Sequence, residues 1–251
     1  MRVKFIQSIK QVSPLVRILL AAYLVMWLGG VAHYAVAGKP PLDAPWAATL
    51  FLALAGLLAL LTASRAQKLP LLIAALIGFL AEIVGVRYGF LFSPYSYTRI
   101  LFPLFLDVPV VMLSAWMVLV AYSWQLWGRM ALNRPALTLV CAGWMTAIDL
   151  VIDPLAANQL GYWHWVERGK YYGIPFHNFA GWFVVSLVIF LLISAPKAVT
   201  NLHLHIGLSI VIFFTVIALS FKVWIAGAAG VLLVTIDLFV RYHSRMNRSS
   251  A

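Results

Sequence analysis

The sequence contains few acidic residues, and their positions are unusual. Only seven of its 251 residues are aspartate or glutamate, and most of these lie inside or beside apolar segments long enough to cross a bilayer. A carboxylate at membrane depth is energetically costly, so it is normally kept for chemistry, ion passage or pairing. The candidates for function are Glu82, Asp107, Asp149 and Asp153. Asp237, near the end of the last apolar segment, is expected to be structural.

The residues that many metal and redox sites require are also scarce. The single cysteine, Cys141, excludes an intramolecular disulfide and a cysteine-based metal site. The six histidines do not form the H-x-x-x-H and H-x-x-H-H arrays that membrane di-iron oxygenases use, which argues against oxygen-dependent hydroxylation. The chain also lacks the G-x-G-x-x-G, Walker and G-x-S-x-G motifs. We therefore expect no cysteine-based metal site, no nucleotide cofactor and no serine hydrolysis.

The composition predicts an integral membrane protein. Hydrophobic residues make up 64% of the chain and charged residues 10%, a balance that soluble domains do not have. The net charge of +11 is typical of basic loops on anionic lipid, so we expect membrane lipid and not nucleic acid as a partner. The basic N-terminus is similar to a secretory signal, but its apolar run is longer than a signal core, so we expect an uncleaved first helix.

Eight apolar segments are candidate membrane spans, because a helix needs roughly 20 apolar residues to cross a bilayer. They are 15–37, 45–63, 69–88, 107–128, 135–157, 176–195, 203–221 and 223–241. With a cytoplasmic N-terminus, twelve of the 18 lysines and arginines fall on the inner side, as the positive-inside rule requires. We predict an all-α polytopic membrane protein in which residues 1–251 form one bundle of about eight transmembrane helices. Both termini would be cytoplasmic, in the cytoplasmic membrane of a prokaryote.

The candidate carboxylates fall at a similar depth under this topology. Glu82 lies toward the outer end of its span, and Asp107 opens the next span on the same side. Asp149 and Asp153, four residues apart on one helix face, approach the outer end of the fifth span. Pro154 predicts that this helix ends at Asp153. The pair either shares a proton, because two close carboxylates in a poorly solvated site do not both ionise easily, or is structural.

Two predicted outer loops are rich in aromatic residues. The loop between the third and fourth spans contains Tyr95 and Tyr97, and the loop between the fifth and sixth contains Trp165 and Tyr171. Such residues form an aromatic belt at the headgroup level. Alternatively, both loops cover the mouth of a pocket, and the sequence leaves the two interpretations open.

Two blocks of sequence carry a resemblance to a known family. The first runs from Glu82-Ile83-Val84-Gly85 through Tyr88-Gly89-Phe90 and Tyr95-Ser96-Tyr97-Thr98 to Val108-Pro109 and Trp116. The second runs from Asp149-Leu150-Val151-Ile152-Asp153-Pro154 through Trp163-His164-Trp165 and Gly169-Lys170-Tyr171-Tyr172-Gly173-Ile174-Pro175 to Asn178-Phe179-Ala180-Gly181-Trp182-Phe183. Over roughly 80–185 the chain resembles the integral-membrane carotenoid biosynthesis family, which includes carotenoid 1,2-hydratases and bisanhydrobacterioruberin hydratases of the CruF type.

The resemblance implies addition of water across the terminal C1–C2 double bond of an acyclic carotenoid end group. The substrate would be a lycopene-like or gamma-carotene-like carotenoid. Protonation of C2 creates a tertiary cation at C1, so the site needs an acid, a means of stabilising the cation and a positioned water, but no metal and no cofactor. We expect Asp153 or Asp149 to deliver the proton, with Asp153 preferred, and the other carboxylate or Glu82 to orient the water.

The other expected contacts to substrate or water are aromatic and polar. An aromatic face near the cation contributes on the order of 1–2 kcal/mol. Asn178 either caps a helix or holds the water, and His177 is either interfacial or part of the site. The remaining candidates are Trp144, Trp165, Tyr171, Trp182, Tyr95, Tyr97 and Asp107.

Other functions stay open. Cyclisation of the end group starts with the same protonation, but an alkene captures the cation. Prenyl transfer needs several aspartates that gather magnesium around a diphosphate, and the pair Asp149 and Asp153 is too sparse for this. A proton-coupled transporter would place acidic residues through the whole membrane depth, whereas these lie at one level. A hydratase is therefore the favoured hypothesis.

Overall fold

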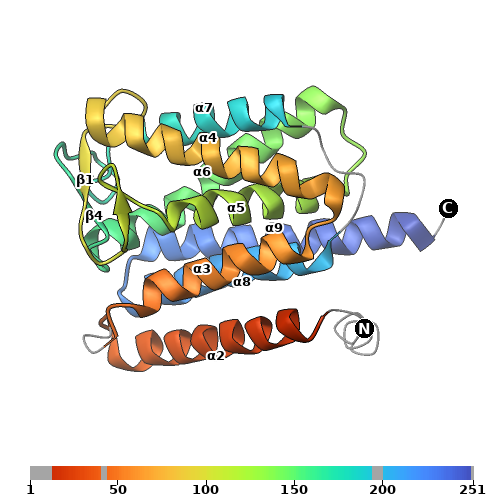
Figure 1. Ribbon diagram of the computed structural model, residues 1–251, viewed down its shortest axis with the longest axis horizontal. Coiled ribbons are helices and arrows are strands. Elements are labelled where there is room, and N and C mark those ends of the chain that lie inside the picture. The colour runs from red at the N-terminus through yellow and green to blue at the C-terminus, as the bar shows by residue number, and fades with distance from the viewer. Residues whose placement is uncertain (1–12, 41–43, 194–199, 250–251) are drawn as a thin grey trace.

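The computed structural model describes residues 13–40, 44–193 and 200–249, which form a bundle of eight helices (Figure 1). The helices are α2 (Pro14–Ala37), α3 (Ala47–Thr62), α4 (Arg65–Tyr88), α5 (Met112–Trp127), α6 (Arg134–Asn158), α7 (Phe176–Leu192), α8 (Asn201–Ser220) and α9 (Trp224–Ser249). The short strands are β1 (Tyr95–Tyr97), β2 (Leu104–Phe105), β3 (Val108–Pro109) and β4 (Trp163–Trp165). The prediction of an all-α bundle of about eight helices is confirmed.

The apolar runs of the sequence set the lengths of these helices. Five of them, α2, α4, α6, α8 and α9, are long and apolar enough to cross a membrane, and α3 and α7 are shorter apolar helices. Side-chain caps fix some of the starts: the Asn133 side chain accepts the backbone N–H of Ala136 at 3.0 Å at the start of α6. The cytoplasmic location of both termini stays a prediction. Some basic residues on which it rests lie outside the described residues, namely Arg2, Lys4, Lys10 and Lys197.

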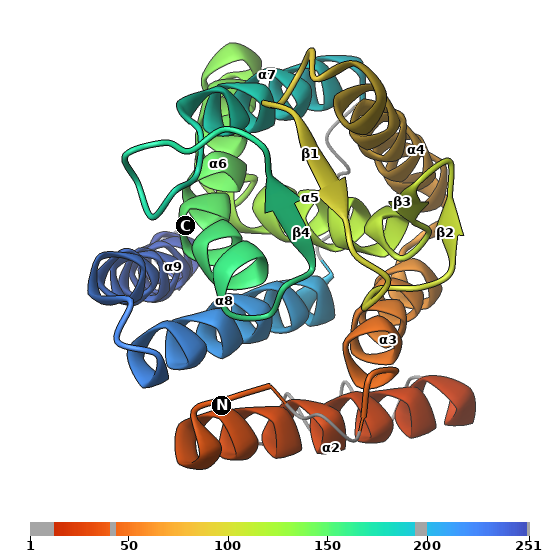
Figure 2. The same cartoon turned by 90° about the vertical axis from the view of Figure 1, so that its left-hand side faces the viewer.

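The loops that were predicted to share one side lie at one end of the bundle. Figure 1 shows β1 and β4 together at this end, whereas α2 begins and α9 ends at the other. The two strands pair antiparallel. In the end-on view of Figure 2 they cross in front of the central helices, and α2 lies at the periphery beneath α3 and α8. The ribbon of β1 and β4 therefore covers the end of the bundle at which the candidate carboxylates were expected.

The prediction that Asp107 opens a helix is wrong, because α5 begins only at Met112. Leu106 and Asp107 instead form the two-residue turn between β2 and β3, where Phe105 pairs with Val108. Both turn residues have positive φ, at 51° and 66°, the backbone that type I′ hairpin turns require. Asp107 is exposed at this turn.

The prediction that Pro154 ends the helix at Asp153 is also wrong, because α6 continues to Asn158. A proline inside a helix removes the N–H that would bond the carbonyl four residues earlier, which is that of Leu150. The hydroxyl of Tyr171 donates to this carbonyl at 2.9 Å. Burial raises the pKa of Tyr171 to about 12, so the donor keeps its proton. A long-range contact thus replaces the lost bond, and the helix continues.

Candidate functional site

Glu82 lies on the buried face of α4 and accepts three hydrogen bonds from neutral donors. The Tyr95 and Tyr97 hydroxyls donate to Oε2, the second at 2.9 Å, and the Trp116 indole N–H donates to Oε1 at 3.2 Å. Burial raises the pKa of both tyrosines well above the ordinary value, and the nearby Glu82 carboxylate raises it further. Both hydroxyls therefore stay protonated. Gly78, one turn before Glu82, makes room for the indole, since a Cβ there would lie 2.2 Å from the Trp116 ring.

The paired strands bring donors for two different carboxylates onto one surface. Tyr95 lies opposite Trp165 and Tyr97 lies opposite Trp163, and alternate residues of a strand share a face. The ring centroids of these pairs are 5.0 and 5.7 Å apart. Both aromatic loops therefore cover a site, in agreement with the second interpretation of the sequence.

Asn178 of α7 joins the two aspartates of α6. Its Nδ2 donates to Oδ2 of Asp149 at 2.8 Å and to Oδ2 of Asp153 at 2.6 Å. The other carboxylate oxygen of Asp153 accepts the indole N–H groups of Trp163 at 2.8 Å and Trp165 at 3.2 Å. Asn178 and both aspartates are buried, with at most 3% exposure. Since α7 begins two residues before Asn178, this side chain is not the helix cap, and its amide is free to serve the carboxylates.

Two cavities meet at this cluster. A chamber of about 20 Å³ is lined by Glu82, Asp153 and Asn178 together with aromatic side chains, most of them from the two strands. A second cavity of about 340 Å³ is lined mainly by apolar side chains, and Asp149 is the one charged group among its described lining residues. The residues that line both spaces are Met112, Trp163 and Trp182. Asp149 thus faces the large apolar cavity, whereas Asp153 faces the small chamber.

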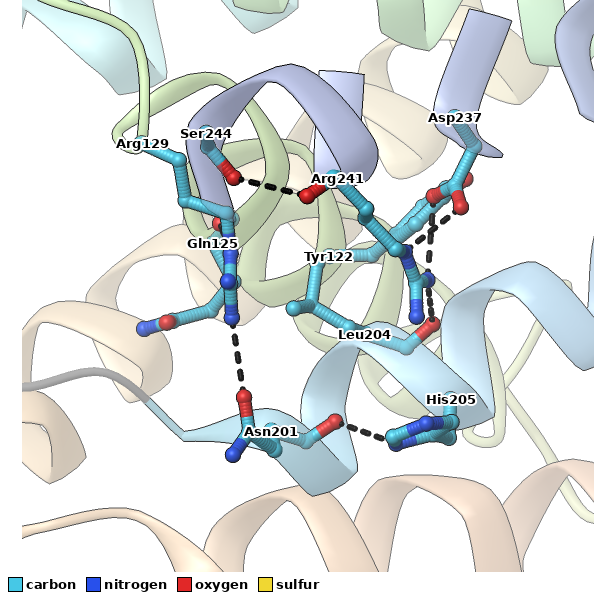
Figure 3. Close-up of polar contacts among 9 residues, drawn as sticks. All are labelled: Tyr122, Gln125, Arg129, Asn201, Leu204, His205, Asp237, Arg241 and Ser244. Atoms are coloured by element: carbon cyan, nitrogen blue, oxygen red, sulfur yellow. Dashed lines mark hydrogen bonds and ion pairs between the residues drawn. The ribbon is translucent and has the colours of Figure 1, made fainter. Parts of the chain in front are cut away.

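Among the described residues, the hydrogen-bond partners of these three carboxylates are all neutral. Asp237 has a different environment, at a separate polar cluster (Figure 3). Its Oδ2 lies 2.6 Å from Nε of Arg241, and the Tyr122 hydroxyl donates to its Oδ1 at 2.9 Å. Arg241 also donates to the Leu204 carbonyl at 2.8 Å. This buried ion pair links α9 to α5 and α8, which supports the structural role expected for Asp237.

The structure brings most of the predicted site residues together. Those that line the two cavities are Glu82, Asp149, Asp153, Asn178, Tyr95, Tyr97, Trp165 and Trp182. Asp107 and His177 are exposed and line neither cavity. Trp144 packs against Trp127, with ring centroids 5.3 Å apart, on the side of the bundle that holds Asp237. These three residues lie outside the site, and Tyr171, which lines neither cavity, donates to the backbone of α6 at Leu150.

Sequence reasoning missed two of the donors, Trp116 and Trp163. Trp163 alternates with Trp165, so assigning a strand there would have placed both indoles on one face. Trp116 carries no such signal, because its contact with Glu82 depends on how α5 packs against α4. Its ring also stacks on Trp182 with a centroid distance of 4.3 Å, which ties α5 to α7 beside the chamber.

Comparison with known proteins gives the site a family context. Over 133 residues the chain is 33% identical to the bisanhydrobacterioruberin hydratase of Haloarcula japonica, and this match covers 51% of the chain but only 45% of that relative. No solved structure matches the chain. The family model for carotenoid biosynthesis proteins matches residues 44–237, a range that includes every carboxylate of the site and both paired strands. The chain therefore belongs to the carotenoid biosynthesis protein family.

Proposed function

We propose that this protein is a cofactor-independent carotenoid 1,2-hydratase that acts in the cell membrane on an acyclic, lycopene-like or gamma-carotene-like end group. The observation that carries the proposal is the junction of two spaces. An apolar cavity with one carboxyl group in its wall adjoins a small chamber lined by two others. Membership of the carotenoid biosynthesis family and the name of the relative support the substrate class and the reaction type.

Asp149 is the better proton donor, in place of the Asp153 that the sequence favoured. The alkene must enter the apolar space, and Asp149 is the carboxyl group that lines it. Hydrogen bonds from the described residues reach only Oδ2 of Asp149, whereas both oxygens of Asp153 accept N–H donors. In its neutral form, Asp149 transfers its proton to C2 of the end group, and C1 becomes a tertiary cation.

The water is proposed to bind in the small chamber. A cavity needs roughly 10–15 Å³ to hold one water molecule, and this chamber has about 20 Å³. Glu82 and Asp153 line it and can accept the protons of that water. The water oxygen bonds to C1, one of its protons passes to the Asp153 carboxylate while Glu82 orients the water, and transfer of that proton from Asp153 to Asp149 restores the acid. The product is a tertiary alcohol, and the protein ends the cycle unchanged.

Aromatic faces and carboxylates surround the place where the cation would form. Trp163 and Trp182 line both cavities, and Trp116 supports Trp182 from behind by stacking. A desolvated cation over an indole face gains on the order of 2 kcal/mol. The nearby carboxylates add Coulombic stabilisation in a poorly screened environment. Trp163 therefore has two roles, because its indole N–H holds Asp153 and its ring is suited to stabilise the intermediate.

The residues that line the large cavity also weigh against prenyl transfer. None of the described residues that line the large cavity is lysine, arginine or histidine, so a diphosphate would have no counter-charge there. Cyclisation would use the same proton donor as hydration, so the product distinguishes the two reactions. The three carboxylates meet at one level, which does not favour a proton path through the membrane.

The test is expression in cells that accumulate lycopene, with growth in heavy-oxygen water. Hydration predicts a product heavier by one water whose hydroxyl carries the label. An isomer of unchanged mass would indicate cyclisation instead, and label taken from molecular oxygen would exclude hydration. The Asp149→Asn variant, checked for equal abundance in the membrane, is the control for background chemistry.

A further inference from the structure

The large cavity extends well beyond the carboxylates, and an outer helix forms one of its walls. Met26, Gly30 and Tyr34 of α2 line it along a single face, because they are spaced one turn apart. The facing wall is α8, through residues that include Phe213. α2 is the least enclosed of the membrane-length helices, with 17% of its most apolar stretch buried. Of the helices that line the cavity, α2 is therefore the one that lies nearest the bilayer.

Aromatic rings line this part of the cavity. Phe51 of α3 stacks on Phe213 with a centroid distance of 5.3 Å, and Phe213 meets Phe214 at 5.7 Å and Tyr34 at 5.9 Å. All four rings line the cavity. A rigid, flat, apolar chain gains dispersion and ring contacts on such a surface, whereas a charged group would find no opposite charge among these four rings.

The volume indicates that only part of a long ligand is enclosed. At about 340 Å³, the cavity lies near the lower end of the roughly 300–1,000 Å³ range of sites for drug-sized ligands. A carotenoid is much longer than its end group, so most of its conjugated chain must lie elsewhere. With the end group at Asp149, the part of the chain next to it would fall on the rings between α2 and α8.

We propose that α2, α3 and α8 form a binding subsite for the conjugated chain of the carotenoid, continuous with the carboxylate site and open toward the bilayer beside α2. The identity of the ligand rests on the proposed function. Hydrogen bonds hold α2 to α8 at one place: the Tyr23 hydroxyl donates to Oγ of Ser209 at 2.7 Å, and the Trp27 indole donates to the Ser209 carbonyl at 2.8 Å. From Met26, beside this attachment, to Tyr34, α2 lines the cavity.

Two adjacent glycines of α2 provide a matched test. A Cβ at Gly30 would lie 2.7 Å from the Phe213 ring, whereas a Cβ at Gly29 would meet nothing within 4 Å. Gly30 lines the cavity and Gly29 does not. Leucine at either position has the same helix propensity and the same hydrophobicity, so the two variants differ in where the side chain points.

The experiment measures binding apart from chemistry. Gly30→Leu and Gly29→Leu are each made in the full chain with Asp149→Asn, purified in detergent, and titrated with lycopene by the change in its visible absorption. We expect Gly30→Leu to weaken lycopene binding at least tenfold and Gly29→Leu to leave it unchanged. Ala48→Leu, which narrows the same cavity from α3, should also weaken binding, so the test does not depend on one variant.

Equal binding by the two glycine variants would overturn the subsite, as would normal binding by both Gly30→Leu and Ala48→Leu in correctly folded protein. Failure of the proposed function has a different signature. In that case, the protein with an intact Asp149 would bind lycopene in a Gly30-sensitive way but form no hydrated product.

Discussion

The two aspartates of α6 should respond differently to replacement by asparagine, although the substitution is the same. Asp153 uses both oxygens as acceptors: Oδ1 takes two indole N–H groups and Oδ2 takes the amide of Asn178 at 2.6 Å. Asparagine has only one oxygen, so in either orientation its NH₂ group faces another N–H donor. Asp149 is hydrogen-bonded by the described residues through Oδ2 alone. An asparagine there can keep this bond and turn its NH₂ toward the cavity.

The magnitudes follow from these contacts. A buried donor left without its acceptor costs about 1–3 kcal/mol, so Asp153→Asn should lower the free energy of unfolding by about that amount, while Asp149→Asn should change it by less than about 1 kcal/mol. Loss of a general acid typically costs about 10²–10⁴-fold in rate. Asp149→Asn should therefore abolish most hydration in a protein of nearly normal stability.

Thermal unfolding of both variants in the same detergent gives the stability difference, and conversion of lycopene per mole of folded protein gives the rate. The assignment of Asp149 as the acid is wrong if Asp149→Asn hydrates lycopene within a few-fold of the unaltered protein. The structural argument is wrong if Asp153→Asn unfolds at the same temperature as Asp149→Asn.

Three further substitutions test the surrounding contacts. Adding Asn178→Asp to the combined Asp149→Asn and Asp153→Asn variant reverses both donor–acceptor pairs, so the triple variant should be more stable than the double variant by about 1 kcal/mol in thermal unfolding; a further loss of stability would argue against direct contact. Tyr171→Phe leaves the carbonyl freed by the proline without a donor and should cost about 1–3 kcal/mol, with little change in lycopene affinity by absorption titration. Gly78→Ala forces the Trp116 ring away from its carboxylate and should cost about 1–3 kcal/mol through overpacking, with a slower hydration rate; an unchanged melting temperature would show that the ring can shift freely.

The helices could be predicted from the sequence because hydrophobic length is a local property. The segment 203–221 was predicted, and α8 spans Asn201–Ser220. The start of α5 was not predictable, because it depends on a hairpin without the usual turn residues. Leu106 and Asp107 adopt positive φ, where Asn-Gly or Asp-Gly is the common signal.

The level of the carboxylates was also predictable, since depth along a helix follows from its position in the span. The hydrogen-bond partners of these carboxylates were not predictable. Four of the donors to Glu82 and Asp153 are arranged by the pairing of β1 with β4, two strands separated in sequence by all of α5 and all of α6. Register between such distant segments is decided by tertiary packing and has no local code. The assignment of the acid changed for the same reason, because only the cavities distinguish Asp149 from Asp153.

Burial alone does not separate the structural carboxylate from the proposed reactive ones, since Asp237 is as fully buried as the aspartates of α6. The charge of the partner does separate the two kinds of carboxylate. Arg241 lies 2.6 Å from Asp237, and a fixed cation at that distance favours the ionised form, which cannot give up a proton. Asp149 and Asp153 are held by an amide and two indoles, which fix their orientation without supplying a positive charge. Neutral donors therefore allow a carboxyl group to be positioned and still exchange its proton, which is what acid catalysis on an alkene requires.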